Sequence, residues 1–165
     1  MTSLRIQNVI AQFESLSPQS VNQLTNLYAN DALFKDPFNE VNGHNAIKHI
    51  FLHMFNQVNN PRFVIKSVLE DGHHASLTWE FEFQFKSSPN QSEIIKGCTW
   101  FTFDQQDLII EHRDYWDAAE ELYEKLPLIG SLMRWLKKGP SIKLSPTISS
   151  LITNQRFSFL AFSTK

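Results

Sequence analysis

Apolar side chains recur at helical spacing in three segments before Pro61, which predicts three helices ahead of any long strand. Ser17 followed by Pro18 is typical of a helix start, because a hydroxyl can cap the backbone and proline tolerates the first helical position. The third segment has the clearest buried stripe. The three stripes are Ile6, Val9, Ile10 and Phe13; Val21, Leu24, Leu27 and Tyr28; and Ile47, Ile50, Phe51, Met54, Phe55 and Val58.

After Pro61 the apolar period changes to two, which predicts β-strands. Asp71-Gly72 is typical of a hairpin turn, and the spacing just before it allows for a bulge. In the next strand Trp79 and the apolar residues at alternate positions are separated by polar residues, which indicates one buried face and one solvent-exposed face. Helices followed by strands predict an α+β domain with the helices on one face of a bent sheet. The expected strands cover residues 63–69, 77–85, 94–103 and 108–116, after a short extended piece at 32–36.

The chain divides into a main domain and a different C-terminal part. Residues 1–117 form the expected α+β domain, and residues 118–140 form a C-terminal helical extension. Gly139-Pro140 ends the extension, which we expect to pack on the domain rather than on a membrane or a partner helix. Residues 141–165 are rich in Ser and Thr, which predicts a poorly ordered tail.

Composition narrows the classes of function. The chain has 165 residues with 14 Phe, 4 Trp and 3 Tyr, so many rings need burial or an apolar ligand. The net charge of −2 without a Lys/Arg cluster argues against nucleic acid as a partner. The one cysteine, Cys98, excludes an internal disulfide and suits a reducing, cytoplasmic location. No apolar run approaches the roughly 20 residues of a membrane-spanning helix, and we expect no cofactor.

Two segments carry a resemblance to a known superfamily. The stretch from Tyr28 to Phe38, followed by Gly43 and Ile47, resembles the first strand region of SnoaL-like proteins and ketosteroid isomerases. The stretch from Glu111 to Asp117 is similar to the closing strand of the same nuclear-transport-factor-two-like superfamily. The resemblance implies a cone-shaped, curved antiparallel sheet around an apolar pocket, with three N-terminal helices on its concave face. It also implies a homodimer through the convex face. Because this fold serves isomerases, cyclases, dehydratases, epoxide hydrolases and binding proteins, it does not supply the reaction.

The resemblance assigns Asp36 to the position of the ketosteroid isomerase aspartate that moves a proton beside a carbonyl. That enzyme also needs a tyrosine and a protonated aspartate as oxyanion donors. Here the first position falls near Gln12 or Phe13 and the second near Thr99, so steroid isomerase activity is not expected. The alternative for Asp36, which precedes Pro37, is a turn opener.

His112 and Asp114 are the strongest local pair. Two residues apart on a strand, they point to the same face and lie about 7 Å apart along the backbone. Strict alternation would put Ile110 and Trp116 on that face too, which we take as the concave one. A buried histidine beside a carboxylate can move protons near neutral pH. The alternative is a satisfied polar pair in the core.

The sequence therefore predicts a pocket protein for a small apolar or carbonyl-containing molecule. The leading hypothesis is acid–base isomerase, cyclase or lyase chemistry without metal, and the alternative is a non-catalytic ligand-binding or protein-interaction module. Glu80 and Glu82 are expected on the outer face, and His49 and His53 at the surface rather than on a metal. The expected catalytic residues are Asp36, His112 and Asp114, and the expected ligand-binding residues are Trp79, Thr99, Trp100, Trp116, Phe55 and Tyr28.

Overall fold

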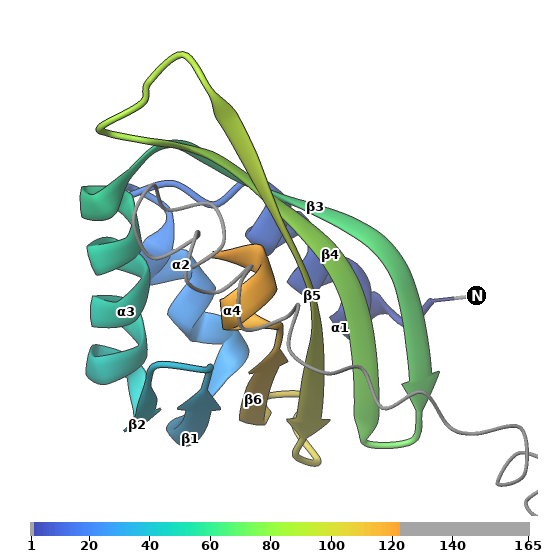
Figure 1. The fold of residues 1–165 in the computed structure, drawn as a ribbon. Helices are drawn as coiled ribbons and strands as arrows, with labels where there is room; N and C mark the ends of the chain where they lie inside the picture. Colours follow the sequence, from blue (N-terminus) through green and yellow to red (C-terminus); the bar gives the residue numbers. More distant parts are fainter. Residues whose placement is uncertain (1, 123–165) are drawn as a thin grey trace, which may run out of the picture.

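The computed structural model describes residues 2–122, which form a strongly curved six-stranded sheet with helices across its concave face (Figure 1). This confirms the α+β class and the cone-like fold. The expected helix after Pro127 and the tail of residues 141–165 lie outside the described residues. The helical segments are α1 (Leu4–Glu14), α2 (Val21–Leu24), the 3-10 turn η1 (Thr25–Leu27), α3 (His44–Gln57) and α4 (Ala118–Glu121). The strands are β1 (Tyr28–Lys35), β2 (Glu40–Asn42), β3 (Val58–Asp71), β4 (His74–Phe85), β5 (Ser92–Phe103) and β6 (Ile109–Tyr115).

The helices form where apolar stripes were expected, but three boundaries differ. Val58, the last residue of the third stripe, opens β3 instead of ending α3. The side chain of Ser3 caps α1 by accepting a hydrogen bond from the backbone of Ile6. Ser17 and Ser20 bond each other's backbone amides in a turn, so α2 begins only at Val21 and the predicted start at Ser17-Pro18 is wrong. Tyr28 opens β1 instead of ending the second helix, because strand pairing with β6 starts at this residue.

The strand order is β2-β1-β6-β5-β4-β3. Four of its five pairings are antiparallel, and β1 runs parallel to β6. Near the start of β3 the pairing with β4 shifts register around Pro61, a place where a missing amide donor is tolerated. A second shift between Ile65 and Ser67 confirms the expected bulge, and β3 turns into β4 at Gly72 as predicted.

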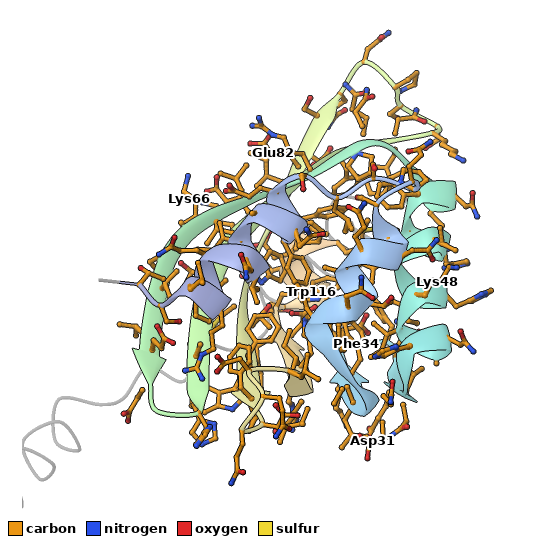
Figure 2. The ribbon with its side chains drawn as sticks, turned by 180° about the vertical axis from the view of Figure 1, so that it is seen from behind. Asp31, Phe34, Lys48, Lys66, Glu82 and Trp116 are labelled. Atoms are coloured by element: carbon orange, nitrogen blue, oxygen red, sulfur yellow. The ribbon has the colours of Figure 1, made fainter. Side chains whose placement is uncertain are left out.

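The alternation along β4 places the predicted residues on the predicted faces. Trp79, Phe81 and Phe83 are buried against the helices. Glu80 forms an ion pair with Lys66, and Glu82 forms one with Arg62, both across to β3. Glu82 and Lys66 lie on the outer face of the sheet (Figure 2). The expectation that the two glutamates lie outside is therefore confirmed.

A bulge in β6 changes the parity that was expected there. Thr102 pairs with Glu111 whereas Phe103 pairs with Ile109, so Ile110 is an extra residue on β6. Ile109 is consequently fully buried, while Ile110 is 38% exposed. The expectation that Ile110 shares the concave face is wrong, because alternation restarts after the bulge.

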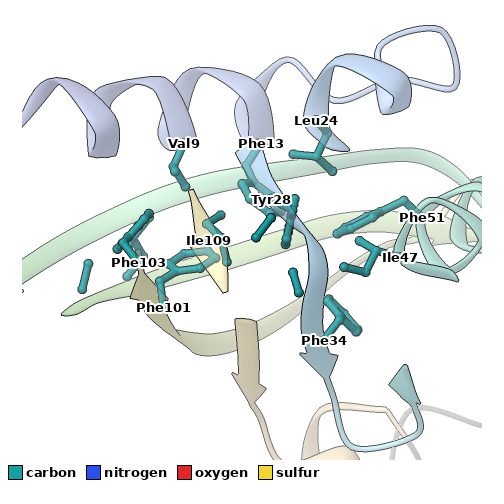
Figure 3. Packing of buried hydrophobic residues seen from close by; sticks show 14 of the residues in the cluster. Val9, Phe13, Leu24, Tyr28, Phe34, Ile47, Phe51, Phe101, Phe103 and Ile109 are labelled. Carbon is teal, nitrogen blue, oxygen red and sulfur yellow. The ribbon is translucent and has the colours of Figure 1, made fainter. Parts of the chain in front are cut away.

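The core lies between the helices and the concave face of the sheet (Figure 3). Phe13 of α1 touches the rings of Phe51 and Phe101 at centroid separations of 5.9 and 6.2 Å. Burying each large apolar side chain contributes about 1.5–3 kcal/mol. A second cluster around Trp79 and Phe83 continues toward the end of the sheet where α4 begins. Within residues 2–122 no helix is long and apolar enough to cross a membrane.

Candidate functional site

Five side chains from four neighbouring strands form one continuous hydrogen-bonded series, named here the buried polar chain. The hydroxyl of Tyr28 lies 2.7 Å from Nδ1 of His112. Nε2 of His112 lies 2.9 Å from Oδ1 of Asp114. The hydroxyl of Thr99 donates to the same carboxylate oxygen, and Nε1 of Trp79 donates to Thr99 at 2.8 Å. Five of the nine predicted site residues are therefore joined.

Strand register explains why these side chains meet. Thr99 of β5 lies directly opposite Asp114 of β6, and His112 precedes Asp114 by two residues on the same face. Trp79 of β4 pairs with Gly97 rather than with Thr99. A Cβ at Gly97 would lie 2.3 Å from the indole ring, so the absence of a side chain there lets Trp79 extend across β5.

The surroundings of His112 determine the direction of each hydrogen bond. The imidazole is 1% exposed and touches the rings of Phe34 and Phe101 at centroid distances of 4.6 and 4.7 Å. Burial, and after it the charge of Asp114, raises the pKa of Tyr28 well above its ordinary value, so the phenol keeps its proton. Tyr28 donates to Nδ1 of His112, and Nε2–H of the same imidazole donates to Asp114. The hydrogen bonds from Tyr28 through His112 and from Trp79 through Thr99 therefore both end at the carboxylate of Asp114.

Of the hydrogen-bonded pair His112 and Asp114, only Asp114 reaches a cavity. The cavity has a volume of about 360 Å³ and is walled by rings and aliphatic side chains from the helices and the sheet. Trp116, two residues after Asp114, lines the same cavity, as does Phe34 (both labelled in Figure 2). The polar lining residues are Asp36, Asn39, His53, Gln57 and Asp114, and the apolar ones include Phe34, Phe38, Phe51, Phe63, Trp79, Phe81, Phe83, Phe85, Trp116 and Leu122.

The other predicted site residues lie at different distances from this cavity. Tyr28 and His112 are buried behind Asp114, and Thr99 borders a void of about 20 Å³ that also touches Asp114, room for roughly one water. Phe55 packs against the main core instead of appearing in the cavity wall. Trp100 lies on the convex face, stacked on His74 at 5.2 Å. Its expected place in the pocket is therefore wrong, because its strand neighbour Thr99 takes the concave side.

Asp36 combines the two alternatives raised by its sequence context. Its Oδ1 accepts hydrogen bonds from the backbone amides of Phe38 at 2.7 Å and Asn39 at 2.6 Å. The side-chain amide of Asn39 also donates to both carboxylate oxygens. Asp36 is thus the turn-forming residue between β1 and β2, and the same carboxylate lines the cavity.

Sequence reasoning missed three polar residues of the cavity: Asn39, His53 and Gln57. His53 was expected at the surface; it is exposed, yet it also lines the cavity beside Gln57, whose side-chain nitrogen lies 3.2 Å from Nε2 of the imidazole. The available signal was the spacing of four residues between them at the end of α3. No group of three or more His, Cys, Asp or Glu side chains within residues 2–122 is arranged to hold a metal ion.

Comparison with known proteins identifies the family. Residues 9–112, more than half of the chain, match the SnoaL-like domain family, and the chain belongs to this family. No curated protein matches the chain.

Solved structures are similar in fold. A protein with a ketosteroid isomerase-like fold from Catenulispora acidiphila, in complex with trimethylamine, is 18% identical, with a TM-score of 0.64 over 74% of this chain and 92% of that one. An NTF2-like protein of unknown function from Burkholderia pseudomallei is 16% identical, with a TM-score of 0.64 over 72% and 95% of the two chains. An LEH-like epoxide hydrolase from M. tuberculosis is 14% identical, with a TM-score of 0.57 over 71% and 83%. At these identities the likeness extends to the fold alone.

Proposed function

We propose that this protein binds a small apolar, carbonyl-containing molecule in the cavity and that Asp114 transfers a proton on it, as in isomerase, cyclase or lyase chemistry. The observation that carries the proposal is the position of Asp114. Its carboxylate lines an aromatic cavity, while its partners His112 and Thr99 hold it from behind. The Catenulispora protein of similar fold is in complex with trimethylamine, and the binding of a small organic molecule by such a fold supports the proposal.

The chemistry follows from this geometry. A carboxylate fixed by two hydrogen bonds and surrounded by rings is a positioned general base for an acidic C–H bond of the ligand. His112 and Thr99 orient the carboxylate, and Tyr28 sets the tautomer of the imidazole by donating to Nδ1. In this proposal Asp36 contacts the ligand at the cavity wall and holds the turn, and Asp114 takes the proton.

Deuterium exchange of a simple ketone tests the proton transfer. We expect the protein to accelerate exchange of the acidic C–H protons of 2-tetralone in D2O, followed by NMR. Asp114→Asn keeps the size and an acceptor but loses the base, so it should lower the rate by about 100-fold or more. Glu82→Gln removes a charge from the outer face and should leave the rate unchanged. Equal rates for Asp114→Asn and the wild type would refute the assignment.

Non-catalytic binding is the second candidate, and one observation favours it. The Trp79 and Thr99 donors next to Asp114 already bond within the buried polar chain, and the Asn39 amide bonds to Asp36. An enolate oxygen would therefore lack a dedicated donor at this wall. This candidate predicts saturable quenching of tryptophan fluorescence by 2-tetralone with no exchange above the buffer rate.

A further inference from the structure

Among the described residues, acidic side chains outnumber cationic ones in the wall of the cavity. Asp36 and Asp114 both line it, whereas no Lys or Arg of the described residues does. Backbone and side-chain amides bond to Asp36, and Thr99 and His112 bond to Asp114. The partners of Asp36 are uncharged amides, so they orient its carboxylate without supplying a counter-charge. A charge in apolar surroundings is costly unless it is paired, so a ligand that fills the cavity needs to compensate it.

The two carboxylates lie at the same end of the cavity. In the parallel pairing of β1 with β6, Lys35 is the partner of Arg113. Asp36 directly follows the end of β1, and Asp114 is the next residue of β6. Lys35 and Arg113 border an outer groove that also touches the carboxylates. Each has another partner there: Lys35 forms an ion pair with Glu40, and the guanidinium of Arg113 lies 5.0 Å from the ring centroid of Tyr115.

An aromatic pair stands beside the carboxylates. Phe38 follows Asp36 by two residues, and Trp116 follows Asp114 by two. Their rings meet edge to face with centroids 5.3 Å apart, and both line the cavity. The faces of such rings attract cations, tryptophan most strongly. Carboxylates and aromatic faces at one end, with apolar walls beyond, form a setting for an ammonium group on an apolar body.

We infer that the ligand carries, besides its carbonyl group, an ammonium group that pairs with Asp36 against Phe38 and Trp116, which leaves Asp114 free as the base. The apolar part then lies along the wall of Phe and Trp rings toward Trp79. This inference rests on the proposal that the cavity is the ligand site, and it adds the charge of the ligand. A neutral molecule of equal shape would supply no counter-charge to either carboxylate.

A pair of probes isolates charge from shape. Benzyltrimethylammonium and neopentylbenzene have nearly the same outline, and neither has a hydrogen-bond donor, so they differ only in charge. We would titrate each into the full-length protein and follow tryptophan fluorescence, since Trp79 and Trp116 line the cavity. The cation should bind at least about tenfold more tightly, and added salt should reduce this preference.

Variants of nearly the same size show which carboxylate causes the preference for the cationic probe. Asp36→Asn and Asp114→Asn keep their hydrogen-bond acceptors, and each should reduce the preference for the cation by about fivefold or more. Glu82→Gln removes the same charge on the outer face and should preserve the preference. Circular dichroism checks that each variant is folded. If the wild type binds neopentylbenzene as tightly as the cation or more tightly, the inference is overturned and the proposed ligand site is retained. If neither probe binds saturably, both proposals are overturned.

Discussion

The indole of Trp79 lies over Gly97 on the neighbouring strand, in the space that a side chain there would occupy. This contact lets Nε1 of Trp79 reach Thr99, and through Thr99 it connects β4 to Asp114. The smallest residue of β5 thus determines the position of one end of the buried polar chain.

Gly97→Ala should therefore destabilise the protein, since its Cβ would lie 2.3 Å from the Trp79 ring. Displacing the indole should cost about 1–3 kcal/mol in the free energy of unfolding, measured with urea. A double variant with Trp79→Phe should show less than additive loss, because the clash is then relieved. Gly72 has open space around its Cβ position, so Gly72→Ala is a control that reports only backbone strain. Similar double-variant and summed losses would contradict the contact.

Tyr28→Phe should cost about 1–3 kcal/mol, because it leaves Nδ1 of buried His112 without its partner. The pH dependence should differ as well. Burial raises the pKa of Tyr28 above its ordinary 10.0, so its stabilising contribution is full below that value. Above it the unfolded chain loses the phenolic proton first, and stability falls as the pH rises toward the raised pKa. Urea unfolding from about pH 8 to 11 should show the gap between wild type and variant narrowing. A constant gap would refute this role of the phenol.

Glu70→Gln should weaken the N-terminus of α1 at neutral pH and have little effect in acid. Glu70 accepts hydrogen bonds from the backbone and hydroxyl of Ser3 and from Arg5. The Ser3 hydroxyl is the main cause of its lowered pKa. The stabilisation is therefore present above the ordinary value of 4.5 and is lost as the pH falls through the lowered pKa. We expect a difference of roughly 0.5–1 kcal/mol at neutral pH.

Unfolding of this variant and the wild type by urea would be compared at neutral pH and below about pH 4. Glu93→Gln, on β5 far along the sheet, is a control at a carboxylate that accepts a hydrogen bond from the nearby Gln91. A destabilisation that persists unchanged in acid would show that charge at Glu70 is irrelevant.

The convex face is proposed as a homodimer interface. Trp100 is 40% exposed and Tyr115 is 51% exposed on this face, where the register pairs Trp100 with Arg113. Trp100→Glu should shift the protein from dimer to monomer in sedimentation experiments, because it puts a charge into an apolar contact. A wild type that sediments as a monomer would exclude this interface.

The site could be predicted in part. The two-residue spacing of His112 and Asp114 was sufficient to place both on one face, and alternation along β4 placed Trp79 inside. Ile110 could not be assigned, because the bulge depends on how β6 pairs with β5. Trp100 was misplaced although it follows Thr99 directly, since adjacent strand residues face opposite sides.

The sequence by itself determined the order of the helices and of the five longer strands and which residue types would be buried, because burial imposes local periods of 3.6 and 2, whereas the three-residue strand β2 was not predicted. Only the tertiary structure decided which side chains meet. Tyr28 and His112 are 84 residues apart and bond because β1 runs parallel to β6. Asp36 and Asp114 share one wall for the same reason. Strand register is set by the packing of the whole sheet, so no local pattern encodes these contacts.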